Sequence, residues 1–521
     1  MAENVLPVLI VGGGPVGLCA ALELDSHGVP VTVVEPRMIV AHSRPRAKTT
    51  SARTMEHFRR WGIADRVREA ASLPVEWSQR VTFVETLLGK EVTHLDGCLG
   101  LSVPDSVSPE KAQQIGQGRV EEVLRRAVSE RPGIRTLYGW EATGLDEHEG
   151  HVVVTVRNAD GRAAHLTTLW AIGADGPRSI VRAAMGTRYE GSSGGRPNVN
   201  ITFRSHELAA RIRHPASLQY WVLDPACPGV VGPLDLDGTW WAIATGAESI
   251  PDELEARRIV RGLVGADIDV GIIATDPWQA RMLLAKEYRR RRLFIIGDAA
   301  HQNPPWGGHG FNTGVGDAVN VGWKLAAVIN GWAPERLLDS YAAERKPVEA
   351  QTIALAQSNM KALSNDLSDG SSSDDDSIAK ANNAARIREL KSPEFYADGL
   401  VFGYGYGESS ADQTPTLADY RPIVAAGNRL PHRWRHGRAL FDVLGQEFTV
   451  IGPASHASAI LKEARRRNIP LTHLRAAGDL ILVRPDQHIA WAGQIAHDPG
   501  PILDEALTGF VRAIPTTTTR T

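Results

Sequence analysis

The chain has 521 residues, 43% of them hydrophobic and 22% charged, and its formal net charge is −3. At roughly 150 residues per domain, this length suggests about three domains of ordinary globular composition. The near-balanced charge excludes a strongly basic protein, so neither nucleic acid nor a membrane is predicted as a partner. No uninterrupted apolar run has membrane-spanning length, and three widely spaced cysteines without a C-x-x-C pair favour a reducing, cytoplasmic setting.

The first predicted unit binds a dinucleotide. An apolar run at residues 8–11 is typical of a buried parallel strand, and it leads into residues 12–17, GGGPVG, and then an alanine- and leucine-rich helix up to residue 26. In this G-x-G-x-x-G pattern Gly12 makes the tight turn, Gly14 lets the backbone approach a pyrophosphate, and Gly17 allows the helix to pack closely on the strand. Pro15 lies at the helix start, where free N–H groups and a partial charge of about +0.5 e favour phosphate.

A second strand at residues 31–34 ends in Glu35. A carboxylate at this point accepts hydrogen bonds from ribose hydroxyls and disfavours a 2′-phosphate. These residues predict a dinucleotide but do not separate NAD from FAD. A tight strand–helix turn without a ligand is the structural alternative.

The middle of the chain alternates between helices and strands. Helices are predicted over residues 51–60 and 113–128, and strands between 135 and 172 end in GADGPR at 173–178. Residues 187–280 are rich in strands and aromatic side chains, which predicts a sheet inserted between the cofactor-binding halves. Aromatic pairs in sheets belong more often to a core than to a pocket, so no single substrate contact is predicted.

Two long helices are predicted over residues 310–330 and 334–363, followed by the polar, acidic stretch NDLSDGSSSDDDS at 365–377, which is typical of a disordered linker. Beyond it come a strand at 448–451, a helix at 457–467, strands at 480–483 and 488–492, and a helix at 501–510. This order suggests an appended α/β domain.

A second glycine-rich segment follows the apolar strand 293–296: residues 297–310, GDAAHQNPPWGGHG. Asp298, at a strand end, can accept hydrogen bonds from a polyol such as the ribityl chain of FAD. Pro305 stiffens an apolar wall, and Gly308 and Gly310 let backbone lie against a flat ring. The helix starting near Phe311 and Asn312 aims its N–H groups at that ring and favours the negative charge of a reduced flavin.

GGGPVG, GADGPR and the block from residue 297 to 326 together resemble the class A flavoprotein monooxygenases, the FAD-dependent aromatic hydroxylases, from the N-terminus to about residue 360. Residues 337–348, LLDSYAAERKPV, also resemble this family. The C-terminal segment is similar to the thioredoxin-like domain of phenol-hydroxylase-type members, here without any cysteine.

The resemblance implies an α/β fold with three parts. A Rossmann-like FAD-binding domain would comprise residues 1–75, 110–186 and 281–364, and a substrate-binding β-sheet domain 76–109 and 187–280. A linker with a disordered part would occupy 365–400, and a thioredoxin-like domain 401–521. A homodimer is left open.

Further site residues follow from the resemblance. Arg46 and Gln117 match family positions that contact FAD, although Arg44 could be the contact instead and the local spacing does not decide between them. Asp175 matches a DG pair associated with FAD and NAD(P)H binding. For the two arginines the alternative is a surface pair, and for Gln117 a helix cap. His309 and Phe311 stand where many relatives carry other residues.

The implied reaction uses NADPH or NADH to reduce FAD, adds O2 at C4a and transfers one oxygen from the hydroperoxide to a small aromatic substrate. Pro305 would border the reacting ring. A base that deprotonates a phenol would help, and His301 and His309 are the candidates, against the alternative of structural histidines. The rival functions are Baeyer–Villiger insertion or epoxidation on a biosynthetic intermediate, and flavin binding without catalysis.

Overall fold

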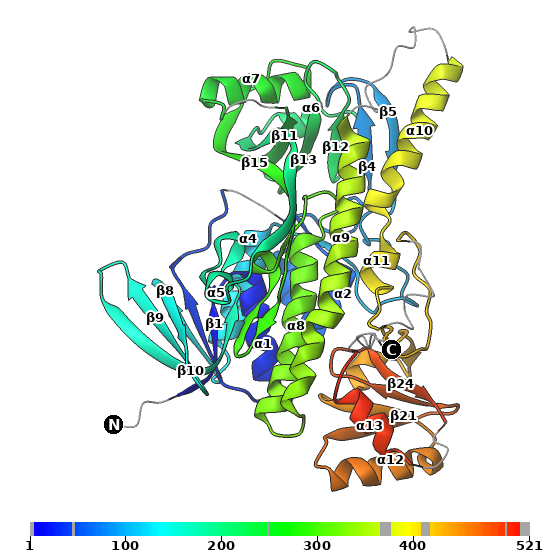
Figure 1. The fold of residues 1–521 in the computed structure, drawn as a ribbon. Helices are drawn as coiled ribbons and strands as arrows, with labels where there is room; N and C mark the ends of the chain where they lie inside the picture. The colour runs from blue at the N-terminus through cyan, green and yellow to red at the C-terminus, as the bar shows by residue number, and fades with distance from the viewer. Residues whose placement is uncertain are drawn as a thin grey trace, which may run out of the picture.

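The computed structural model describes residues 5–43, 47–246, 250–364, 377–407, 417–494 and 498–510. Figure 1 shows three parts: a sheet around β1 at the lower left, a second sheet at the top, and a small C-terminal sheet at the lower right. Two long helices, α8 (Gly310–Ile329) and α9 (Ser340–Ser364), run between these parts.

The first sheet has a parallel centre. Its order is β16-β17-β10-β1-β2-β7, and β1 pairs in parallel with β2 and β10, as β10 does with β17. Val11 lies opposite Gly173, which in turn lies opposite Ile295, so the three glycine-containing loops start side by side at the carboxyl edge, where ligands bind in open α/β sheets. The strands are β1 (Leu6–Val11), β2 (Val31–Glu35), β7 (Ile134–Tyr138), β8 (Trp140–Glu147), β9 (Val152–Asn158), β10 (Ala163–Gly173), β16 (Arg289–Arg290) and β17 (Leu293–Ile295).

Helices cover this sheet because its strands are apolar on both faces. Val8, Leu9 and Ile10 are fully buried, as expected for a central parallel strand. The helices of this part are α1 (Pro15–Ser26), α2 (Ala52–Arg60), α3 (Ala64–Ala70), α4 (Gln117–Ser129), α5 (Ile180–Ala184), and the short 3-10 turns Gly176–Arg178, Gly297–Ala299 and Glu335–Asp339. The predicted helix at 113–128 is shorter than expected, because β6 (Gln113–Gln114) instead pairs with β3 (Thr49–Thr50).

The second sheet has the order β18-β15-β11-β14-β13-β12-β4-β5. It buries Phe203, Trp240 and Val260 in a core of its own. Its strands are β4 (Val81–Val84), β5 (Glu91–Leu95), β11 (Tyr189–Arg204), β12 (Gln219–Val222), β13 (Gly229–Pro233), β14 (Thr239–Thr245), β15 (Gly271–Ala285) and β18 (His301–Gln302), with α6 (Leu208–Arg211) and α7 (Glu253–Val264) beside them. Because β18 belongs to the late glycine-rich block, that block ties the two sheets together.

The segment assigned to a linker is largely helical where it is described. Residues 365–376, where disorder was predicted, lie outside the described residues, but α10 (Ser377–Phe395) and α11 (Asp398–Phe402) follow them. Ile387 and Phe395 are buried against Trp221 and Trp306. The linker prediction missed these helices because a few apolar anchors in an otherwise polar stretch give little periodic signal.

The C-terminal part is a four-stranded sheet of order β22-β21-β23-β24, in which β21 and β22 are parallel and the other pairs antiparallel. It contains β21 (Phe448–Gly452), α12 (Ala454–Arg466), β22 (Leu471–Arg475), β23 (Leu480–Val483), β24 (Ile489–Gly493) and α13 (Gly500–Ala506), preceded by β19 (Trp434–Arg435), β20 (Arg438–Ala439) and a 3-10 turn, Leu440–Val443. It packs on α8, where the Trp323 and Phe448 rings meet edge to face at 6.0 Å.

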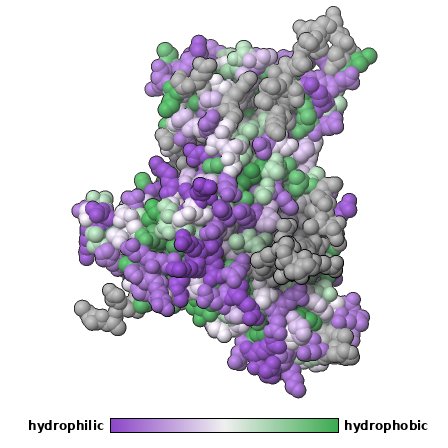
Figure 2. Space-filling model, in the orientation of Figure 1, coloured by the Kyte–Doolittle hydropathy of each residue, from purple (hydrophilic) through white to green (hydrophobic). Residues whose placement is uncertain are grey.

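Buried charges also join this part to the rest of the chain. Glu344 on α9 accepts hydrogen bonds from Arg484 at 2.7 and 2.9 Å and from Lys324 at 2.7 Å. On the face shown in Figure 2, hydrophilic residues cover much of the surface and hydrophobic residues form scattered patches. Among the described residues, no helix has both the length and the apolar character needed to cross a membrane.

Candidate active site

The first glycine loop has the geometry of a phosphate cradle. Gly12 has φ +103°, and a Cβ there would lie 2.3 Å from the Ala174 carbonyl oxygen, while a Cβ on Gly17 would lie 2.0 Å from the Gly12 oxygen. A Cβ on Gly14 would meet only the Arg37 guanidinium, at 4.0 Å. Gly12 and Gly17 are therefore required by the fold, whereas Gly14 leaves open space at the N-terminus of α1, whose first residue is Pro15.

Glu35 is buried at the end of β2 and holds this loop. Its Oε2 accepts from the Gly13 N–H at 2.8 Å, and its Oε1 accepts from the backbone N–H and Nε of Arg37 at 3.0 and 2.6 Å. A carboxylate has about four lone-pair sites, so Glu35 retains one for a ribose hydroxyl.

The late glycine block meets the first loop. A Cβ on Gly297 would lie 3.2 Å from Val16, and one on Gly314 would lie 2.8 Å from the same side chain. The residue after Gly297, Asp298, is exposed on its 3-10 turn, and its carbonyl oxygen accepts from the Tyr189 hydroxyl. The two motifs predicted to grip one dinucleotide are thus adjacent.

Asn312 links the late block to the segment that follows residue 46. Its Nδ2 donates to the Thr49 and Gly308 carbonyl oxygens at 3.0 and 2.8 Å, and its Oδ1 accepts from the Ser51 N–H and the Thr54 hydroxyl, both at 2.8 Å. Its side chain is therefore engaged with protein groups on every side. It positions the loops rather than presenting free polar atoms to a ligand.

The turn before α8 exposes backbone. Gly307 and Gly308 have φ +90° and +69°, in the left-handed region, and Gly310 begins α8 with Phe311 half-buried in its first turn. Pro305, Gly307 and Gly308 line a large cavity of about 830 Å³. The backbone of Gly307 and Gly308 therefore borders the cavity, two residues before the start of α8 at Gly310.

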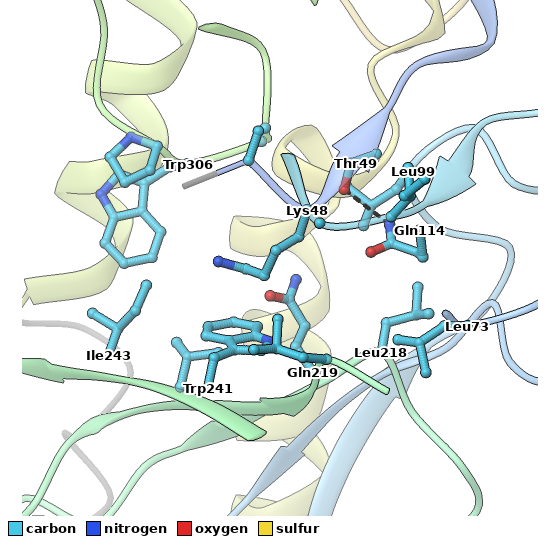
Figure 3. Close-up of a pocket in the computed structure, with 18 of the residues that line it drawn as sticks. Lys48, Thr49, Leu73, Leu99, Gln114, Leu218, Gln219, Trp241, Ile243 and Trp306 are labelled. Carbon is cyan, nitrogen blue, oxygen red and sulfur yellow. Dashed lines mark hydrogen bonds between the residues drawn. The ribbon is translucent and has the colours of Figure 1, made fainter. Parts of the chain in front are cut away.

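The cavity lies between this turn, residues 47–49 and the second sheet (Figure 3). Its wall is mainly apolar and aromatic, formed by Leu73, Leu99, Leu218, Val230, Trp241, Ile243, Trp306 and Phe395. The Trp306 ring of this wall packs against the Trp221 ring, with the two ring centres 5.6 Å apart. The Trp306 Nε1 is buried and has no hydrogen-bond partner among the described residues.

Gln117 fixes one edge of the cavity. Its backbone N–H donates to the Ala47 carbonyl oxygen at 2.8 Å, and its Oε1 accepts from the Ala47 N–H at 3.3 Å. It also begins α4. The structure thus places Gln117 as an anchor for the segment after residue 46. Arg44 and Arg46, the two predicted cofactor contacts in that segment, lie outside the described residues.

Asp175 caps a helix. Its Oδ2 accepts from the Ile180 and Val181 N–H groups at 2.7 and 3.3 Å, whereas its buried Oδ1 has no partner among the described residues. Burial raises the pKa of Asp175, and the Ser179 side chain together with the backbone N–H groups offsets this rise only in part. The free oxygen leaves room for one further donor near the nucleotide loops.

The two candidate histidines have opposite surroundings. His301 is fully buried between Asp317 and Glu349, with Nε2–Oδ2 and Nδ1–Oε2 distances of 2.9 and 3.2 Å. Burial alone would lower the pKa of His301, but the two carboxylates outweigh it and raise the pKa to about 9. His301 does not line the large cavity.

His309 lines two smaller adjoining cavities. Burial lowers its pKa to about 4, so its ring is neutral at neutral pH. Its Nε2 has no hydrogen-bond partner among the described residues. Because the raised pKa keeps His301 protonated at neutral pH, His309 is the one of these two histidines whose ring could accept a proton or a hydrogen bond.

Comparison with known proteins identifies the family. Residues 5–356 match a family model described as an FAD binding domain. The chain is 30% identical over 573 residues to a 4-methyl-5-nitrocatechol 5-monooxygenase of Burkholderia sp, covering 98% of this chain and 97% of that protein. The chain belongs to the FAD-dependent aromatic hydroxylases, the class A flavoprotein monooxygenases.

Other relatives agree with this assignment. This hydroxylase is 29% identical over 590 residues to a phenol 2-monooxygenase of Pseudomonas sp. (strain EST1001), covering 96% and 92% of the two chains. It also resembles the crystal structure of the flavin-dependent monooxygenase PieE in complex with FAD and substrate, with a TM-score of 0.87, 28% identity and coverage of 97% and 100%. The open space at Gly14 and the exposed backbone of Gly307 and Gly308 fit FAD.

Sequence reasoning missed several cavity residues. Trp241 lies on a strand where aromatic residues usually indicate a core, and Glu394 and Phe395 lie at the end of the unpredicted helix α10. Lys48 lies next to the predicted arginines, but nothing in its local pattern marks it. These residues are brought together only by tertiary structure.

Proposed function

We propose that this enzyme hydroxylates a phenolic or polycyclic aromatic substrate with NADPH or NADH as the electron donor and O2 as the oxidant. The observation that carries this proposal is the apolar, aromatic cavity between the Gly307–Gly308 turn and the second sheet. Flat rings can stack on Trp241 and Trp306 there. Relatives named for nitrocatechol and phenol support the same substrate class.

The cofactor contacts follow from the geometry. Gly12, Gly14, Pro15 and Gly17 would hold the pyrophosphate at the start of α1, Glu35 a ribose, and Asp298 the ribityl chain. Gly308, Gly310 and the first turn of α8 with Phe311 would border the isoalloxazine ring. Asp175 and its unpaired oxygen would complete the nucleotide site. Gln117 and Asn312 act through the loops that they hold.

When bound, FAD supplies the redox chemistry and the transfer of one oxygen atom. The protein's own contribution is to orient the ring and to exclude water. Trp306 and Phe395 close the cavity on the side of α10, and Pro305 forms the rigid wall beside the turn. A dry cavity limits loss of the activated oxygen as peroxide.

His301 acts as a structural residue in this proposal, because its Nε2 is hydrogen-bonded to Asp317 and its Nδ1 lies 3.2 Å from the buried Glu349 carboxylate. Arg345 donates to the same two carboxylates at 2.8 and 2.7 Å, which adds a second buried cation beside them. His309 is the better of the two candidates for a proton acceptor, since it is neutral and its Nε2 is unpaired.

The C-terminal part is proposed to be a thioredoxin-like domain without redox function. A parallel β21–β22 pair joined by α12, followed by an antiparallel β23–β24 hairpin and α13, supports this assignment. No cysteine occurs after Cys227. Its role here is to pack on α8 and α9.

The test is to load the protein with FAD and follow NADPH and NADH oxidation across a panel of phenols and polycyclic polyketides, with mass spectrometry of the products. Substrate-stimulated oxidation with gain of one ring oxygen supports the proposal. Oxygen inserted as an ester or an epoxide would support the rival chemistry instead. Yellow protein that oxidises neither nucleotide with any member of the panel would refute catalysis.

A further inference from the structure

Lys48 extends into the cavity from a backbone that is held on both sides. Its carbonyl oxygen accepts from the Ile115 N–H at 2.9 Å. The following residue, Thr49, pairs with Gln114 and accepts from its side-chain amide at 2.9 Å. Figure 3 shows Lys48 crossing the cavity with its amine above Trp241. The lysine Nζ lies 4.0 Å from the centre of that ring.

No carboxylate neutralises this amine within the part of the chain that the structure describes. Glu394 is the other ionisable residue that lines the cavity, and its Oε2 is already 2.6 Å from the Lys391 Nζ. Lys48 is half-buried because one side of its chain faces the cavity. Burial lowers its pKa to about 8, so it still carries charge at neutral pH.

An unpaired cation in an apolar cavity is poorly solvated. The face of Trp241 offsets part of that loss, because a cation over an indole ring is attracted by its quadrupole. An anionic group on the ligand would compensate for the rest of the solvation free energy that the Lys48 amine loses. Besides Lys48 and the Lys391-paired Glu394, the side chains that line the cavity are uncharged, Gln114 and Gln219 among them, so an anionic ligand would pair with this one cation.

We propose that Lys48 is a specificity-determining residue that pairs with an ionised oxygen, a phenolate or a carboxylate, on the aromatic substrate. This inference rests on the proposed function. Lys48 would set the orientation of the ring in the cavity and so the carbon that faces the reacting atoms. Neutral aromatic compounds of the same shape would bind less tightly and in less defined poses.

The position of the amine favours the substrate over the flavin as its partner. Trp241 belongs to β14 of the second sheet, whereas the backbone predicted to face the flavin ring is at Gly307 and Gly308. If the charge served mainly to stabilise reduced flavin, its removal would lower the flavin reduction potential in the absence of any ligand. That potential therefore separates the two roles.

The experiment uses FAD-loaded wild-type protein and the variants Lys48→Met, Lys48→Gln and Lys48→Arg, with Lys90→Met as a control at an exposed lysine. Dissociation constants are measured for two matched pairs: 2-naphthoate with 2-naphthamide, and 4-nitrophenol with 4-nitroanisole. The visible absorbance of bound nitrophenol reports whether it is ionised. FAD content and melting temperature are recorded for each variant, and the flavin potential is measured without ligand.

We expect the wild type to prefer the ionised member of at least one pair, and Lys48→Met and Lys48→Gln to lose about 10- to 100-fold of that affinity. The neutral members, the control and the flavin potential should be unchanged, and Lys48→Arg should restore part of the preference. If the Lys48 variants lose affinity for the ionised member of only one pair, the ionised oxygen of that compound is identified as the partner of Lys48. The melting temperature of Lys48→Met should not fall, since no ion pair is broken.

The inference is overturned if the Lys48 variants bind both members of each pair equally more weakly, or bind both as tightly as the wild type does. A shifted flavin potential with the ligand preference intact also overturns it. The proposed function fails separately. If affinity depends on Lys48 as expected but no compound in the phenolic panel gains oxygen, the binding site stands and the hydroxylation does not.

Discussion

Two single substitutions in the first glycine loop, Gly14→Ala and Gly17→Ala, should separate the effect on FAD binding from the effect on stability. In Gly14→Ala the new Cβ meets only the Arg37 guanidinium at 4.0 Å, and the backbone at φ −72° and ψ 175° is accessible to alanine. The unfolding free energy of the FAD-free protein should therefore change by less than about 1 kcal/mol. In Gly17→Ala the Cβ would lie 2.0 Å from the Gly12 oxygen, so backbone must move and the protein should be strongly destabilised.

In Gly14→Ala the new methyl group projects into the space assigned to the pyrophosphate. Overpacking of this kind costs about 1–3 kcal/mol, which corresponds to a roughly 5- to 140-fold weaker dissociation constant for FAD. Urea unfolding of the stripped proteins and titration by flavin fluorescence measure the two effects. If Gly14→Ala binds FAD as tightly as wild type, or is destabilised as much as Gly17→Ala, the assignment of the phosphate loop is wrong.

Three further outcomes can be checked. Glu344→Gln should lose about 3–5 kcal/mol of unfolding free energy at neutral pH, since it breaks a buried charge network. Arg484 and Lys324 outweigh burial and lower the pKa of Glu344 from 4.5 to about 2. The difference in unfolding free energy between wild type and variant should therefore shrink as pH falls through that interval. A difference that stays constant in acid would contradict this pKa shift. Phe395→Ala should cost about 3–5 kcal/mol and admit water, raising the peroxide formed per NAD(P)H consumed; unchanged coupling would exclude Phe395 as a barrier. His309→Gln should leave the shape of the neutral pH–rate profile intact, because the pKa of His309 is about 4; loss of a limb near the ordinary histidine pKa would show that His309 titrates there.

The nucleotide loops could be predicted from sequence because their determinants are local. Gly12 has positive φ, Gly17 approaches the Gly12 oxygen within the same turn, and Gly14 has an open face, whereas the close contact of Gly12 with Ala174 comes from a distant loop. The helix predicted over residues 51–60 likewise begins close to its predicted position, at Ala52, where the Ser51 hydroxyl accepts from the Thr54 N–H at 3.2 Å.

Roles that depend on distant partners were harder to assign. Gln117 and Asn312 are predicted cofactor contacts, and in the structure their side-chain amides bind backbone of the segment after residue 46. An amide serves a loop and a ligand with the same atoms, so residue type cannot distinguish the two. Strand β22, with the sequence LTHLR, was not predicted because it is a mostly half-buried edge strand with a weak apolar pattern.

The residues proposed to bind FAD and the residues that form the cavity wall differ in the same way, since the former are local in sequence and the latter are distant. The groups proposed to hold FAD belong to short motifs at the edge of the first sheet, whereas the cavity wall is assembled from Lys48, Trp241, Trp306 and Phe395, which come from four separate parts of the chain. Because these wall side chains do not form the phosphate cradle at Gly14, changes in them should alter which aromatic compound is held while leaving FAD in place. If the cavity holds the substrate as proposed, we expect substrate choice to depend on the tertiary assembly of these wall residues, so that changes at a few of them fit the enzyme to different rings.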